Sequence, residues 1–77
     1  MVQAYILIQT EVGRPRDVAS AIRDIPGVLR VDAVMGGYDV IVLAEAAGVD
    51  DLGTMVISRI QLVPGITRTV TCSVVNL

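Results

Sequence analysis

The sequence predicts an α+β fold, built from two strand–helix–strand halves that share one antiparallel sheet. Two observations predict it: the second half of the chain repeats the first, and apolar residues change from a strand-like to a helix-like period twice. A chain of 77 residues has room for one small domain only. Residues 1–77 are therefore expected to form a single domain.

The repeat has an offset of 38 residues. The segment VASAIRDIPGVLR (18–30) aligns with VISRIQLVPGITR (56–68), including the Pro-Gly pair in each. An apolar run suited to a strand precedes each segment: QAYILIQ (3–9) in the first half and YDVIVLA (38–44) in the second. The element order is thus βαββαβ, the ferredoxin-like arrangement.

The first repeated segment is expected to begin as a helix. Pro15 suits the first helical position, and Asp17 is favourable in the first turn. The predicted apolar stripe of this helix contains Val18, Ala21, Ile22 and Ile25. The helix should stop at Pro26-Gly27, because proline disfavours helix in the residue before it and glycine allows the turn.

The second helix follows the same plan. Leu52, Val56 and Ile60 form its apolar stripe, and Asp50-Asp51 lie at its expected N-terminal end. It should also stop at a Pro-Gly pair, residues 64–65.

Strand composition predicts the order of the sheet. YILI (5–8) and VIVLA (40–44) are continuous apolar runs, typical of central strands, whereas VLRVDAV (28–34) and ITRTVTCSV (66–74) alternate with polar residues and suit the edges. The order is then 4-1-3-2, with both helices on one face.

The two edge strands carry apolar sets that the repeat places on opposite faces. One set is Leu29, Val31, Ala33 and Met35; the other is Val70, Cys72 and Val74. The pattern does not choose which set meets the helices. The open face must carry apolar side chains in either case, so we expect a second subunit's sheet to cover it, forming a dimeric α+β barrel.

Composition supports association and argues against two other roles. The chain is 53% hydrophobic with a mean hydropathy of +0.69, yet no apolar run approaches the ~20 residues of a membrane helix. No secretory leader is visible, so a cytoplasmic protein is expected. Six arginines, no lysine and a net charge of −2 give no clustered positive face, so direct nucleic-acid binding is not expected.

The sequence lacks the residues on which most catalysis depends. There is no histidine, lysine or tryptophan, which excludes imidazole acid–base chemistry, Schiff bases and nearly all transition-metal sites. Cys72, the single cysteine, lies within an apolar alternation and is expected to be a core residue. We therefore expect no catalytic residue, no metal and no cofactor.

The stretch GGYD (36–39), before the third strand, favours a binding role. Glycines permit φ > 0 in a turn and let a ligand approach backbone N–H groups. Asp39 can hold an α-amino group, and Tyr38 can wall a small pocket. A purely structural turn, in which Tyr38 packs at the strand edge and Asp39 bonds the turn backbone, explains the same residues.

These features together resemble the effector-binding (RAM) domain of the Lrp/AsnC, or feast/famine, transcriptional regulators. The similarity covers the whole chain and centres on GGYD and on VPGITRTVTCSVV (63–75). It implies sheet-mediated dimers, their assembly into rings such as octamers, and amino-acid effectors bound between dimers. For this apolar chain we expect at least a dimer, with eight or ten chains as the larger assembly. The effector-contacting residues that the resemblance implies are Gly36, Gly37, Tyr38 and Asp39, with Thr69 and Thr71 on the last strand.

The usual family members also carry an N-terminal helix-turn-helix domain. The first predicted strand begins at about Gln3, so we expect a stand-alone RAM domain that acts through full-length regulators. Two alternatives stay open: a small dimeric α+β-barrel enzyme, such as a cofactor-free monooxygenase, and an assembly module without a ligand.

Overall fold

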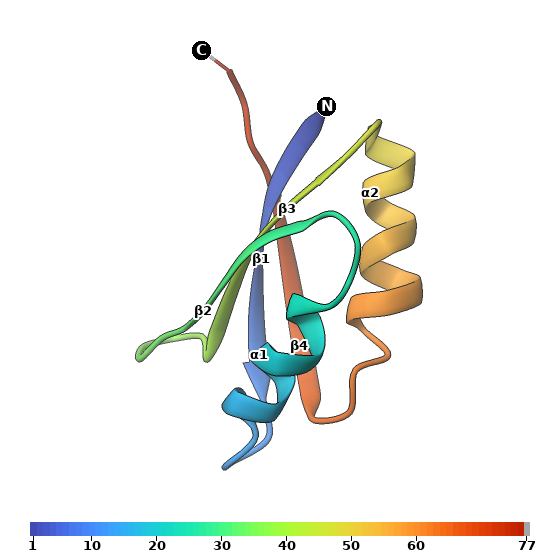
Figure 1. The fold of residues 1–77 in the computed structure, drawn as a ribbon. Helices are drawn as coiled ribbons and strands as arrows, with labels where there is room; N and C mark the ends of the chain where they lie inside the picture. The colour runs from blue at the N-terminus through green and yellow to red at the C-terminus, as the bar shows by residue number, and fades with distance from the viewer. Residues whose placement is uncertain (77) are drawn as a thin grey trace.

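The computed structural model describes residues 1–76 as one antiparallel sheet with helices on one face (Figure 1). The strands are β1 (Val2–Thr10), β2 (Val28–Ala33), β3 (Val40–Ala46) and β4 (Ile66–Ser73). Their order is β2-β3-β1-β4, and every neighbouring pair is antiparallel. The predicted ferredoxin-like fold and its strand order are confirmed.

Helix α1 (Pro15–Arg23) begins as predicted, with proline in its first turn and Asp17 beside it. Its buried face is different from the prediction: Ala19 is buried together with Val18 and Ile22, whereas Ala21 is exposed. At 100° per residue, Ala19 and Ala21 lie on opposite sides of the Val18–Ile22 line. Helical spacing alone does not show which of the two alanines is buried. The packing of α1 on the sheet buries Ala19.

The second helix has two parts. Helix α2 (Val49–Met55) continues directly into a π-helical turn, η1 (Val56–Ile60). The predicted stripe of Leu52, Val56 and Ile60 is buried along its whole length.

The core lies between the helices and one face of the sheet. Its strand side chains are Ala4, Ile6, Ile8, Val31, Val40, Val42, Ala44 and Ala46. No polar side chain in the described part of the chain is buried. Apolar burial therefore holds the helices on the sheet without help from internal ion pairs.

Register settles which edge-strand set meets the helices. Val31 pairs with buried Val42 and is itself buried, so the β2 set faces the helices at this position. Val70 pairs with Leu7 and Cys72 with Tyr5, residues that alternate with the buried ones of β1, so the β4 set lies on the open face. The expected core position of Cys72 was wrong: its side chain is exposed in the single chain.

The 38-residue repeat in the sequence is matched by a repeat of β-bulges in the edge strands. The β2–β3 register shifts between Val28 and Arg30, and the β1–β4 register shifts between Gln9 and Thr10, opposite Thr67. Leu29 and Thr67 are equivalent in the 38-residue repeat. The bulge leaves Leu29 outside the core, 49% exposed, instead of beside Val31.

Candidate functional site

One end of the sheet gathers three connections (Figure 1). Because neighbouring strands are antiparallel, the β1–α1 loop, the β2–β3 turn and the η1–β4 loop all lie at the end opposite the N-terminus. The GGYD residues lie in the second of these connections in chain order, the β2–β3 turn.

The GGYD turn is anchored to the end of β1. The Asp39 N–H donates to the Ile8 carbonyl at 2.9 Å, and the Thr10 N–H donates to Asp39 Oδ2 at 2.8 Å. The Gln9 side-chain amide donates to the Gly37 carbonyl at 3.0 Å. Asp39 therefore bonds the neighbouring strand, and its carboxylate continues the ladder past the point where β3 begins.

The tip of the same turn is bare. A Cβ placed on Gly36 or Gly37 would meet no atom within 4 Å, and Met35 beside them is fully exposed. Gly36 has φ +149°, which disfavours a side chain, but Gly37 has no such restriction. Neither packing nor backbone geometry within this chain requires glycine at position 37.

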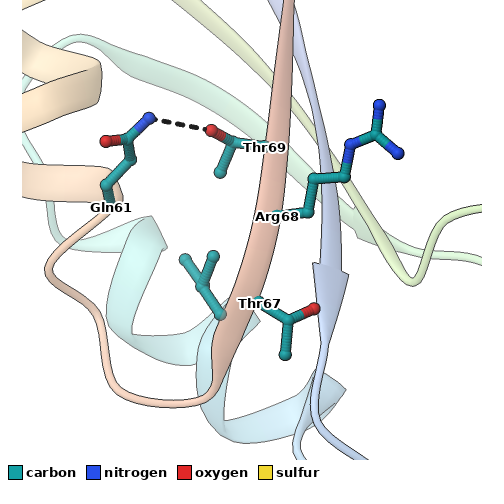
Figure 2. Close-up of a pocket in the computed structure, with 5 residues that line it drawn as sticks. Gln61, Thr67, Arg68 and Thr69 are labelled. Atoms are coloured by element: carbon teal, nitrogen blue, oxygen red, sulfur yellow. Dashed lines mark hydrogen bonds between the residues drawn. The ribbon is translucent and has the colours of Figure 1, made fainter.

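Thr69 lies on the helix side of β4, and strand β1 separates it from the turn. It pairs with Ile8 of β1, and its hydroxyl accepts a hydrogen bond from the Gln61 amide at 3.0 Å. Figure 2 shows Gln61 and Thr69 pointing toward one another across a hollow of about 330 Å³, while Arg68 points to the other side of the strand.

Thr71 lines a neighbouring hollow of about 290 Å³ between β4 and the α2–η1 helix. Leu52, Val56 and Ile57 form much of its apolar wall, with Gln61 and Ser73 as polar neighbours. This volume matches the lower end of small-molecule pockets.

The structure thus brings the predicted residues together in two groups. Residues 36–39 form one group at the β2–β3 end, and Thr69 and Thr71 form the other on the opposite edge strand. The described hollows around Thr69 and Thr71 include no residue of the turn. None of the described hollows in the single chain is lined by residues of both groups.

Three polar residues beside these groups were not predicted: Gln9, Thr10 and Gln61. Gln9 and Thr10 end the first strand, and their contact with the turn is shown by hydrogen bonds that the sequence does not reveal. Gln61 is placed by the π-helical turn, whose geometry is invisible in an apolar period. Over residues 1–76 there is no group of three His, Cys, Asp or Glu able to hold a metal ion.

The sequence is similar to a known protein family and to known proteins. Residues 3–76 match the family model of the Lrp/AsnC ligand binding domain. An uncharacterized HTH-type transcriptional regulator of Pyrococcus furiosus, PF0250, is 36% identical over 71 residues, covering 88% of this chain and 47% of that protein. The chain therefore spans about half the length of the curated relatives it matches.

Solved structures show the same fold. The protein TTHA0845 from Thermus thermophilus has a TM-score of 0.93 at 30% identity, covering 100% of this chain and 96% of that one. The transcriptional regulator NMB0573 of Neisseria meningitidis, solved as a complex with L-Met, has a TM-score of 0.86 at 21% identity. That match covers 97% of this chain and 50% of the regulator, and it shows likeness of fold alone.

Proposed function

The chain belongs to the Lrp/AsnC ligand-binding domain family, and from this premise we propose that it is an oligomeric sensor of an amino acid or a related metabolite. It is a ligand-binding domain and not an enzyme, which removes the monooxygenase alternative. In the proposal, residues 1–77 act as one domain, the effector binds at residues 36–39, and the signal reaches transcription through a regulator with its own DNA-binding domain.

This proposal rests on one observation: hydrogen bonds hold the turn in place, while Gly36 and Gly37 at its tip are exposed to solvent. Hydrogen bonds from Gln9 and Thr10 hold the turn, so its position costs little further ordering when a ligand arrives. A Cβ atom added to Gly36 or Gly37 would enter open space. A preorganised backbone beside open space is what a small polar ligand needs in order to approach main-chain N–H groups.

Asp39 supplies the charge for an α-amino group. Its Oδ2 atom is used by Thr10, and a carboxylate has capacity for further donors on its other oxygen. Tyr38 is half-buried and stands next to it. In the proposal an ammonium group bonds Asp39, while Thr69 and Thr71 contact the same ligand from a neighbouring subunit.

A calorimetric and thermal-shift screen of the twenty amino acids tests the proposal. L-methionine belongs in the first group, because the Neisseria regulator of the same fold was solved with it. We expect at least one amino acid to raise the melting temperature in a saturable way. No response to any of the twenty, with the oligomer intact, would favour the assembly module without a ligand.

Gly37→Ala is the sharpest variant for the proposed site. Alanine meets no atom within 4 Å and needs no forbidden backbone angle, so stability should stay level or rise by roughly 0.4–1 kcal/mol. A methyl group at a ligand-contacting backbone should nevertheless weaken the effector at least about tenfold. Unchanged affinity in this variant would remove the tip of the turn from the site.

A further inference from the structure

We propose that helix α1 carries a second binding site, for a small molecule bearing a diphosphate group. The site is a hollow of about 600 Å³ at the junction of α1 and the end of β2. Its polar lining is Arg16, Ser20 and Arg23, and its apolar lining includes Pro15, Ala19 and Ala33. No residue of the 36–39 turn lines it, so this site is separate from the proposed effector site.

Helical spacing puts the three polar side chains on one face. Ser20 follows Arg16 by four residues and precedes Arg23 by three, and both steps return to the same side of an α-helix. Seven residues span about 10 Å along the axis. Two long guanidinium side chains with a hydroxyl between them can therefore converge on one extended anionic group.

The two guanidinium groups are free to bind. Among residues 1–76, the ion pairs shorter than 4.0 Å are Arg14–Asp17 and Arg30–Asp32, and neither involves Arg16 or Arg23. No carboxylate lines the hollow. The lining of the hollow is therefore positively charged, although the whole chain has a net charge of −2.

The shape favours a ligand larger than a single phosphate ion. Guanidinium groups bind phosphate oxygens through two parallel N–H bonds, and two such forks match two linked phosphoryl groups. Pro15 and Ala33, which are accessible to solvent, give the hollow an apolar surface beside them, on which a flat group can lie. A nucleoside diphosphate combines both features, and pyrophosphate provides the charged part alone.

Isothermal titration of the intact protein with pyrophosphate, ADP and adenosine tests the inference. We expect pyrophosphate and ADP to bind, ADP more tightly, and adenosine to give no signal. Binding should weaken as ionic strength rises, because the site is open to solvent. Adenosine binding as well as ADP, or no heat with millimolar pyrophosphate, would overturn the proposal.

Variants separate this site from a general effect of positive charge. Arg16→Gln and Arg23→Gln should each weaken pyrophosphate about tenfold or more, as expected for losing a charge-assisted contact. Arg59→Gln removes the same charge from an exposed position outside the hollow and should leave affinity unchanged. Equal losses in all three variants would contradict a site on α1. Gly37→Ala should leave pyrophosphate binding unchanged, so failure of the effector proposal is distinguishable from failure of this one.

Discussion

Asp39 shows how one side chain completes a sheet. Thr10 is the last residue of β1, and its N–H donates to the Asp39 carboxylate, just before β3 begins at Val40. Asp39→Ala should leave this partly buried donor unsatisfied and lower the free energy of unfolding by about 1–3 kcal/mol. Asp39→Asn keeps an acceptor oxygen and should cost less. Urea denaturation of both variants checks the ranking, and equal stability of Asp39→Ala and the wild type would contradict this role.

The same pair of variants separates the two interpretations of the turn. If Asp39 also holds the α-amino group of an effector, Asp39→Asn should weaken binding about ten- to a hundredfold while its melting temperature stays near that of the wild type. Asp50→Asn is a suitable control, because Asp50 is an exposed carboxylate at the start of α2. Equal affinity in the wild type and Asp39→Asn would leave the carboxylate a structural group.

Single residues were the least predictable level from sequence. The GGYD stretch indicated a turn with a special carboxylate, but the hydrogen-bond partner of Asp39 lies 29 positions away. Cys72 was predicted to be a core residue from its apolar alternation. Alternation identifies a face, not what covers it, and the covered face became clear only through pairing with Tyr5.

Among the elements, the α2–η1 helix allows the contribution of its buried apolar residues to stability to be compared with that of its exposed ones. Ile60 is fully buried and Ile57 is 64% exposed, although they are only three residues apart in the same π-helical segment. Ile60→Ala should cost about 2–5 kcal/mol, a large share of the stability of a domain this small. Ile57→Ala should stay within about 0.5 kcal/mol. Thermal or urea denaturation measures both, and equal losses would mean that the helix does not dock as described.

Elements were predicted well where one principle dominates. Apolar periods identified both helices and all four strands, and the Pro-Gly pairs marked the turns before β2 and β4, where Gly27 and Gly65 have φ of 95° and 98°. The bulges at Leu29 and Thr67 could not be predicted, because a bulge exists only relative to the partner strand. The π-helical turn was missed for a similar reason: it leaves the apolar stripe unbroken.

At the scale of the whole molecule, the main feature is the sheet face that no helix covers. Its centre holds six side chains that are apolar or nearly so: Tyr5, Leu7, Ile41, Leu43, Val70 and Cys72. Charged residues of the outer strands, including the Arg30–Asp32 pair, lie at its margin. An apolar centre with a polar margin is typical of a protein interface. A second copy of the chain, sheet against sheet, is the partner we propose.

Leu7 is the position at which to test this assembly, because Ile41 and Val70 flank it in register. Leu7→Glu would place a charge in the middle of the proposed interface, where its desolvation opposes association. We expect light scattering to show an oligomer of at least two chains for the wild type and a monomer for Leu7→Glu. Ser58→Glu, on the exposed side of η1, should keep the wild-type size.

Cys72 provides a second measure of the same interface. Its thiol is exposed in the single chain and lies opposite Tyr5 on the open face. A second sheet would cover it, so a thiol reagent should modify the wild type slowly and Leu7→Glu quickly, with Ser58→Glu behaving like the wild type. A monomeric wild type at micromolar concentration with a rapidly modified Cys72 would contradict the dimer. The shared effector site would fail with it, because in the proposal Thr69 and Thr71 contact the ligand from a neighbouring subunit.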